Sequence, residues 1–361
     1  MRSDALLKWI VLILVLAGFF ILSSASIGLT TKKDLSPYYY VLRQLAMGGA
    51  LGLVSMAITS RIPYRFWRKF AIPLYVAGLI LGVLVLIPSI GISFGGARRW
   101  IGFGPVNFQP SEFIKFAYIA YLSAVFSAKY AAIKTFREGL LPFILVSVLA
   151  GTLIISEPDV GTFGVMAISG LFLFLAAGGS LKHICLIILA GAVLFSALVR
   201  FEPYRLERFK VFTDRTHDPQ GSGYQLRQAL IAIGSGGIFG RGFGMSRQKF
   251  QYLPEPVGDS IFAVAAEEFG FVGSAILVSL FILFAWRGVV VSLEASDSFG
   301  RLFGSGIVIL IIVQALVNIA ALSGLLPLTG IPLPFVSQGG SALAITLAEI
   351  GILLNISRAR L

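Results

Sequence analysis

Runs of mostly apolar residues recur along this chain and limit what it can fold into. A membrane-spanning helix needs about 20 such residues in a row. Soluble domains carry roughly 25% charged residues, whereas this chain carries 13%. A soluble fold could not bury so much apolar surface, but lipid can cover it. We therefore predict an all-α integral membrane protein of about ten transmembrane helices, near residues 9–29, 41–60, 70–88, 113–129, 140–156, 161–178, 181–199, 260–286, 303–325 and 339–356.

Lysine and arginine in the short loops predict the orientation, because cytoplasmic loops carry an excess of both. With the N-terminus in the cytoplasm, most basic residues fall inside, and the short outside loops hold only Lys32, Lys33, Arg98 and Arg99. The C-terminus is then cytoplasmic too, and a large extracellular loop, 200–259, lies between helices 7 and 8. We predict one polytopic domain over residues 1–361 in the cytoplasmic (inner) membrane.

The remaining composition argues against several kinds of site. Cys185 is the only cysteine and lies in an apolar run, so no disulfide framework or cysteine metal site is expected. His183 and His217 are the only histidines, which argues against a multi-histidine metal site and a Ser-His-Asp triad. The net charge of +12 comes from short basic clusters between apolar runs. Membrane orientation explains these clusters better than nucleic-acid binding does.

The first polar segment on the outside is 91–115, GISFGGARRWIGFGPVNFQPSEFIK. Glu112 and Lys115 are three residues apart at the start of a helix, so they share a face. One interpretation is an interfacial anchor with a structural ion pair. The other is an anion-binding mouth in which Arg98, Arg99 and Lys115 meet phosphate.

The large loop contains two helical patterns and a glycine-rich stretch. Residues 200–212 place charges beside aromatic side chains, which is typical of a helix lying in the membrane interface. Residues 224–233 form an amphipathic turn or re-entrant segment, and several glycines follow between 234 and 244. Their GxGxxG-like spelling lacks the preceding strand of a dinucleotide site, so we interpret it as backbone that bends at the membrane surface.

Carboxylates gather where this loop enters the next helix. Glu255 and Asp259 precede the helix, and Glu267 and Glu268 lie two turns inside it. Acidic residues inside a membrane helix are costly and indicate function, but an ion pair with a basic residue on a neighbouring helix would also explain them. Asp259 could cap the helix or act as a general base, because a helix N-terminus favours the ionised form that a base needs.

Two shorter outside segments also contain unusual residues. In 156–162, Glu157 and Asp159 flank a proline between two helices, which is typical of a turn with a cap. The segment 323–341, SGLLPLTGIPLPFVSQGGS, contains prolines and glycines that break a helix. Such backbone is tolerated at membrane depth where it is buried in protein or lines a cavity.

Taken in order, these motifs resemble a known family. The chain contains GARRWI, QPSEFIK, EPDVGT, a stretch from GSGYQ to YLPE, an aspartate before IFAVAAEE, and LPLTGIPLPFVSQGGS. In this order they resemble the SEDS family (shape, elongation, division and sporulation), which includes FtsW and RodA. The resemblance runs over most of the chain, and the spelling of the GSGYQ to YLPE stretch is more similar to the division member FtsW.

The resemblance implies a peptidoglycan glycosyltransferase whose substrate is lipid II, a disaccharide-pentapeptide on undecaprenyl pyrophosphate. It places the essential aspartate at Asp259. The predicted substrate-binding set is Arg98, Arg99, Glu112, Lys115, Asp159 and Glu255. The chain departs from the family where PEAHTDF reads PEPVGDS, where SYGGSS reads SQGGSA, and where an acid before YLP is Gln251.

The mechanism implied is inverting transfer in cell division or elongation. Asp259 removes the proton of an acceptor 4-hydroxyl, and undecaprenyl pyrophosphate leaves the donor. Arg98, Arg99 and Lys115, with or without a divalent cation (Mg²⁺ or Mn²⁺), offset the charge on the leaving group, and Glu112 holds Lys115.

The resemblance also implies partners: membrane lipid, lipid II and a class B penicillin-binding transpeptidase. Two alternatives stay open. One is a lipid II flippase or other membrane transporter, which could use Glu267 and Glu268 for ion coupling. The other is a scaffold that only recruits the transpeptidase.

Overall fold

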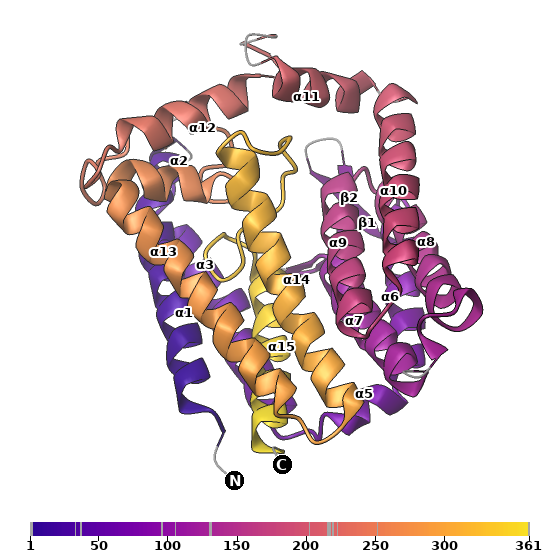
Figure 1. Cartoon of the computed structure of the whole chain (residues 1–361). Helices are drawn as coiled ribbons and strands as arrows, with labels where there is room; N and C mark the ends of the chain where they lie inside the picture. The colour runs from indigo at the N-terminus through magenta and orange to yellow at the C-terminus, as the bar shows by residue number, and fades with distance from the viewer. Residues whose placement is uncertain are drawn as a thin grey trace.

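Helices make up most of the structure and lie where the apolar runs predict them (Figure 1). This computed structural model describes residues 3–32, 34–36, 38–94, 97–104, 106–129, 132–201, 203–214, 218, 220–221, 223–250 and 252–359. Lys33, His217 and Gln251 lie outside the described residues. The helices at the predicted spans are α1 (Ala5–Ala25) with α2 (Ile27–Lys32), α3 (Tyr39–Gln44) with a π-helical turn (Leu45–Ala50) and α4 (Leu51–Thr59), α6 (Ala71–Leu86), α7 (Pro110–Ala128), α8 (Leu141–Ser156), α9 (Val160–Ala176), α10 (Leu181–Phe201), α13 (Ile261–Leu293), α14 (Ser298–Leu322) and α15 (Gly340–Arg358).

A multi-pass membrane protein is confirmed by the length and composition of these helices. In the described part of the chain, six segments are long and apolar enough to cross a membrane, and α6, α9 and part of α10 are shorter apolar helices. The two termini lie at the same end of the bundle (Figure 1). The total of about ten crossings stays a prediction.

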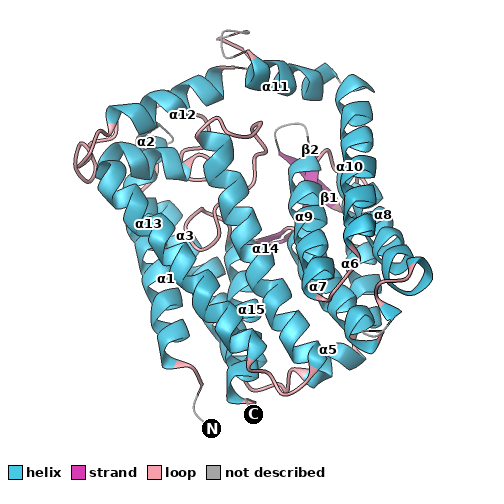
Figure 2. Cartoon of the chain, viewed as in Figure 1, coloured by secondary structure: helices cyan, strands magenta, loops and turns pink. Residues whose placement is uncertain are grey.

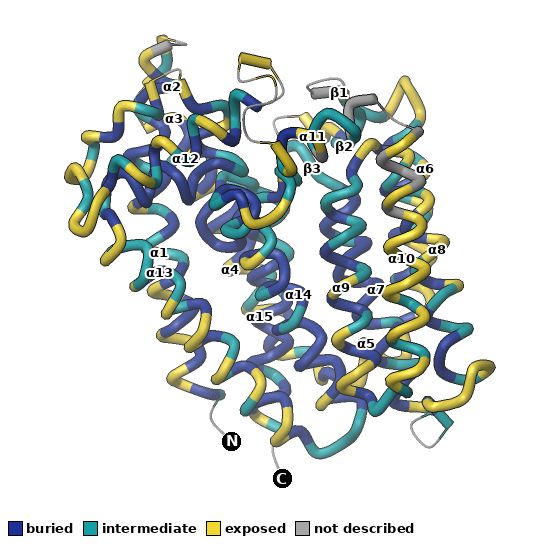
Figure 3. The backbone as a smooth tube through the Cα atoms, turned by 45° about the horizontal axis from the view of Figure 1, so that its top comes forward, coloured by how far each residue is buried: buried dark blue, intermediate teal, exposed yellow. Residues whose placement is uncertain are grey.

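Helices α7, α14 and α15 form the centre of the bundle, because most of their residues are buried (Figure 3). Helix α10 stands at one edge with large apolar side chains exposed, among them Leu189 and Val193. In a bilayer such side chains contact lipid, so their exposure agrees with a membrane fold.

Three further helices are short. Helix α5 (Arg65–Lys69) lies near the end that carries the termini, whereas α11 (Pro203–Thr213) and α12 (Tyr224–Ser235) lie across the opposite end (Figure 1). Helices α11 and α12 occupy the two helical patterns predicted in the large loop. The polar segments singled out in the sequence therefore gather at one end of the bundle.

A small antiparallel sheet occupies the first polar segment and was not predicted (Figure 2). Its strands pair in the order β1 (Gly91–Phe94), β2 (Ala97–Phe103) and β3 (Val106–Phe108). Strands this short cannot be told from a loop by their alternation of apolar and polar residues. The sheet ends just before Pro110, the first residue of α7, and so determines where that helix begins.

Helix α13 is broken at Gly270, where φ is 64° and ψ is −161°. The glycine-rich loop pairs with the break: Arg241 N donates to Glu267 O at 3.0 Å, and Phe271 N donates to Gly237 O at 2.9 Å. A Cβ atom on Gly270 would lie 2.3 Å from Gly240 N, so only glycine fits. The loop therefore supplies partners for backbone groups that the break frees.

The two glutamates inside α13 hold the same loop in place. Glu268 Oε1 accepts hydrogen bonds from Lys249 Nζ at 2.7 Å and from Ser24 Oγ of α1 at 2.6 Å, and Lys249 is fully buried. Glu267 accepts from the Ser246 hydroxyl at 2.5 Å and pairs with Arg241 at 3.6 Å. The predicted ion pair is confirmed for Glu268, although its base comes from the loop and not from a neighbouring helix.

We expect Lys249→Met to destabilise the protein strongly. Removing one partner of a buried pair leaves an uncompensated charge, which costs about 3–5 kcal/mol. Thermal unfolding of the purified protein in detergent should show a much lower Tm than the parent. The control is Lys210→Met, which removes a partly exposed pair with Glu207. Equal Tm values for the two variants would contradict the assignment.

Candidate functional site

Asp259 lies at the end of the large loop, two residues before α13 begins. Its half-buried carboxylate accepts hydrogen bonds from Gln225 Nε2 of α12 at 3.2 Å and from Ser260 Oγ at 3.4 Å. Ser260 occupies the N-cap position, so the capping interpretation of Asp259 is wrong. These bonds use about two of the four lone-pair directions of a carboxylate, which leaves the group able to contact a ligand.

The backbone around Asp259 is held by the non-helical segment between α14 and α15, residues 323–339, which we call the broken segment. Asn318 Nδ2 of α14 donates to both Asp259 O and Ile331 O at 2.7 Å. Ser337 Oγ donates to Gly258 O at 2.7 Å. Gly330, at φ 70°, lies so close that a Cβ atom there would be 3.7 Å from Asp259 Oδ2. The aspartate is therefore fixed from two sides.

The surroundings of Asp259 raise its pKa to about 6, mainly through burial. The hydrogen bond from Gln225 opposes this rise. The negative charge of Glu255 raises the pKa further, and the positive charge of Arg208 lowers it. A carboxylate with such a pKa is mostly ionised at neutral pH but binds protons more readily than an ordinary aspartate.

Arg208 of α11 brings a positive charge to this site. Its Nη1 atom donates to Leu328 O at 2.8 Å, two residues before Gly330. The interfacial helix is thereby attached to the broken segment next to Asp259. The sequence places Arg208 in the large loop but gives no sign that it approaches the aspartate.

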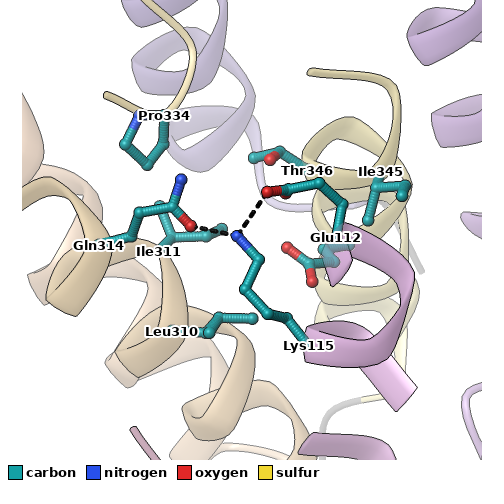
Figure 4. Close-up of a pocket in the computed structure, with 9 residues that line it drawn as sticks. Glu112, Lys115, Leu310, Ile311, Gln314, Pro334, Ile345 and Thr346 are labelled. Atoms are coloured by element: carbon teal, nitrogen blue, oxygen red, sulfur yellow. Dashed lines mark hydrogen bonds and ion pairs between the residues drawn. The ribbon is translucent and has the colours of Figure 1, made fainter. Parts of the chain in front are cut away.

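Glu112 and Lys115 form the predicted ion pair on α7. Lys115 Nζ lies 2.8 Å from Glu112 Oε1, and both side chains are buried. Lys115 also donates to Gln314 Oε1 of α14, as Figure 4 shows. Gln314 Nε2 in turn donates to Pro332 O at 3.0 Å. The pair is thus connected to the broken segment.

Arg99 and Asp159 meet at the turn between α8 and α9. Arg99 Nε donates to Glu157 O at 2.9 Å, another of its nitrogens donates to Pro158 O, and Nη1 lies 4.0 Å from Asp159 Oδ2. Asp159 is the N-cap of α9 and accepts from Thr162 N at 3.1 Å. Burial, together with the charge of Asp159, raises the pKa of Glu157 to about 8.

The turn also reaches the broken segment. A Cβ atom on Gly161 would lie 2.7 Å from Thr329 O, so the two backbones are in contact. Arg99, Asp159, Glu112 and Lys115 are therefore all connected to the segment that borders Asp259. Within the described residues, none of them forms a hydrogen bond or ion pair with Asp259.

Arg98 and Glu255 lie in different surroundings from these residues. Arg98 Nη1 donates to Leu86 O at the end of α6, 3.1 Å away, so it stabilises the helix end. Glu255 is exposed at φ 47°, and its carbonyl accepts from Ser260 N at 3.2 Å. Glu255 acts on Asp259 through its charge, whereas Arg98 faces away toward α6.

Sequence patterns did not predict the side chains that hold the site: Gln225, Asn318, Gln314, Ser337 and Arg208. Each is a polar residue in an apolar or loop sequence. The signal that could have found Gln314 and Asn318 is their spacing of four within α14, which places both amides on one face.

The described residues do not fit a divalent cation held by the protein alone. No group of three or more His, Cys, Asp and Glu side chains in them could hold a metal ion. Mg²⁺ is usually held by one or two carboxylates together with water or substrate phosphates.

Comparisons with known proteins agree across the whole chain. The model of a family described as cell cycle protein, which covers FtsW, RodA and SpoVE, matches residues 4–361. Stage V sporulation protein E of Bacillus subtilis is 41% identical over 98% of this chain and 97% of its own length. A probable peptidoglycan glycosyltransferase FtsW of Trichlorobacter lovleyi is 39% identical over 98% of this chain and 93% of its own.

Solved structures share the fold. A chain of a peptidoglycan synthase complex, described as coordinating polymerization and crosslinking, superposes with a TM-score of 0.81 at 28% identity, covering 100% of this chain and 99% of that one. The rod shape determining protein RodA of Thermus thermophilus gives a TM-score of 0.74 at 28% identity, covering 100% and 98%.

We expect Asn318→Leu to lower the Tm. The change leaves the carbonyls of Asp259 and Ile331 without their donor, and each buried unsatisfied group costs about 1–3 kcal/mol. Thermal unfolding in detergent measures the effect. The control is Thr152→Val, which removes an exposed hydroxyl bonded only within its own helix. If both variants have the same Tm as the parent, Asn318 does not hold the aspartate.

Proposed function

The chain belongs to the family of FtsW, RodA and SpoVE, and we propose that it is a peptidoglycan glycosyltransferase that polymerises lipid II. The 41% and 39% identical relatives cover nearly the whole chain, and the second is named a probable peptidoglycan glycosyltransferase. The polar loops lie at the end opposite the termini (Figure 1). Lysine and arginine predict that this end is outside the cytoplasmic membrane.

The observation that carries the proposal is the setting of Asp259. It combines a half-buried carboxylate, a pKa near 6 and a rigid backbone with a cationic side chain nearby. A general base works best when its pKa lies close to the working pH. A carboxylate placed only to stabilise the fold would be expected to have its lone pairs occupied by nearby donors.

The proposed reaction is an inverting transfer. Asp259 takes the proton from the 4-hydroxyl of the acceptor sugar as its oxygen attacks the anomeric carbon of the donor. The bond from that carbon to the pyrophosphate oxygen breaks, and undecaprenyl pyrophosphate leaves with the electron pair. The carboxyl group then returns its proton to solvent.

The charge on the leaving pyrophosphate needs a positive group close to Asp259. Arg208 meets this requirement best, because it bonds Leu328 O beside Gly330 and its charge acts on Asp259. Lys115 bonds Gln314 and Arg99 bonds the α8–α9 turn, and the charges of these two are not among those that act on Asp259. We therefore propose that these two position the broken segment and that Arg208 contacts the pyrophosphate.

The proposal extends to a partner and a process. A similar chain occurs in a complex that couples polymerization and crosslinking, so we propose a class B penicillin-binding transpeptidase as the partner. Division, with an FtsW-like role, is favoured over elongation by the spelling of the GSGYQ to YLPE stretch.

We expect Asp259→Asn to lose glycan polymerisation by about 10²- to 10⁴-fold, the range for a general base. The amide keeps the shape and can still bond Gln225, so the fold should be retained. The assay uses the purified full chain with labelled lipid II, with and without the transpeptidase, and gel separation of glycan strands. Glu207→Gln on α11 is the control.

Two results of that assay would count against the proposal. If Asp259→Asn polymerises glycan at the parent rate, Asp259 is not the general base. Vesicles in which the parent moves labelled lipid II between leaflets without forming glycan would favour a flippase.

We expect the polymerisation rate to rise with pH through an apparent pKa near 6, because the ionised form of Asp259 is the base. Glu255→Gln removes a negative charge that raises this pKa, so the rise should move to lower pH. Arg208→Gln removes a positive charge that lowers it, so the rise should move to higher pH. Measured pH–rate profiles that shift in the same direction for both variants would contradict the assignment.

A further inference from the structure

A small cavity between α7, α14 and α15 is lined by more carboxyl groups than ammonium groups. Glu112, Lys115 and Glu349 line it and are 5%, 3% and 3% exposed. Gln314 and Thr346 complete its polar wall, and Figure 4 shows Thr346 on the side of Glu112. The cavity therefore contains two carboxyl groups and one ammonium group.

The hydrogen bonds in the cavity are unevenly distributed. Lys115 Nζ is engaged with Glu112 Oε1 at 2.8 Å and with Gln314 Oε1. In contrast, neither the Glu349 carboxylate nor the Thr346 hydroxyl bonds another described residue, although both side chains are more than nine-tenths buried. A hydroxyl in the interior of a protein normally has a partner, so the hydroxyl of Thr346, which lines the cavity, indicates a ligand independently of the charge count.

The surrounding elements do not neutralise Glu349. Helix α4, the preceding π-helical turn and β3 pack on α15 and carry no ionisable side chain. On α13, Glu267, Glu268 and Arg287 are paired with Arg241, Lys249 and Asp4, and Arg301 of α14 is exposed. The charged groups that act on Glu349 are Lys115 and Glu112, both on α7. An unpaired charge is costly in a membrane interior, where charged groups pair with one another or with an ion. One further positive charge is needed.

We propose that this cavity binds one monovalent cation from the solvent, with the Glu349 carboxylate and the Thr346 hydroxyl as its principal partners. The cation is a sodium ion or a proton, which satisfy the same charge. Oxygen donors suit a hard cation, and interrupted membrane helices commonly provide such sites near the centre of the membrane. Pro334 of the broken segment lines this cavity too.

The site goes beyond the proposed glycosyl transfer, because the cavity lies at the ion pair of α7 and not at Asp259. A bound cation would fix α15 against α7 and α14. It would also leave Glu112 as the sole carboxylate partner of Lys115. Binding is measured through stability, so the result does not depend on catalytic activity.

The test compares the Tm of the purified full chain in sodium chloride and in N-methylglucamine chloride at equal ionic strength. A ligand that binds only the folded state raises the Tm. We expect sodium to raise the Tm of the parent and of Glu138→Gln, which alters an exposed ion pair. Glu349→Gln should lose the response, and Thr346→Val should need more sodium for the same shift.

A second set of Tm measurements, made without sodium over a range of pH, distinguishes a bound proton from a bound sodium ion. If a proton fills the site, the folded state binds it and the parent becomes less stable from mildly acidic to mildly alkaline pH, while Glu349→Gln does not. A parent Tm that responds neither to sodium nor to pH overturns the proposal without any variant. Equal responses of the parent and Glu349→Gln to both also overturn it.

Discussion

The backbone between α14 and α15 leaves its helix inside the bundle, and its free polar groups need partners there. Side chains supply them: Gln314 donates to Pro332 O and Asn318 to Ile331 O. Gln44 of α3 accepts from Gly339 N at 2.9 Å and donates to Ser337 O at 3.3 Å. Because these partners come from helices far apart in the sequence, satisfying this one segment fixes how those helices pack. The same bonds position Asp259, because Asn318 also donates to the carbonyl of Asp259.

The polar residues connected with Asp259 therefore divide into two kinds. Asp259, Glu255 and Arg208 act on one another electrostatically at the end of the bundle opposite the termini. Lys115 and Asp159 instead support the broken segment. Lys115 does so through Gln314, which bonds Pro332 O, and Asp159 does so through the turn that touches Thr329. Substitutions of the second kind should alter the chemistry only by displacing backbone beside Asp259, because none of those side chains forms a hydrogen bond or ion pair with the aspartate within the described residues.

Sequence patterns predicted the features that depend on local spacing. Apolar runs located the helices, and the separation of three between Glu112 and Lys115 predicted their ion pair. Features that depend on how distant segments approach were not predicted. The single span expected over 260–286 is broken at Gly270, since nothing in the local sequence separates that glycine from one tolerated inside a helix. The approach of Arg208 and Gln225 to Asp259 likewise requires the large loop to fold back over the bundle.

Charge balance distinguishes three of the acidic centres among the described residues. Around α13, Glu267 and Glu268 are matched by Arg241 and Lys249, so that cluster is neutral and needs nothing from solvent. At the cavity beside α7, Glu112 and Glu349 share Lys115 alone, so folding leaves one charge to be supplied. Asp259 lies between these cases: it is half-buried at the end of a loop, and Arg208 only partly offsets its burial and the charge of Glu255. Incomplete compensation keeps its pKa near 6, and a general base is most efficient when its pKa lies close to the working pH. The matched cluster gives rigidity, and the incompletely matched carboxylates are the ones that can respond to a ligand.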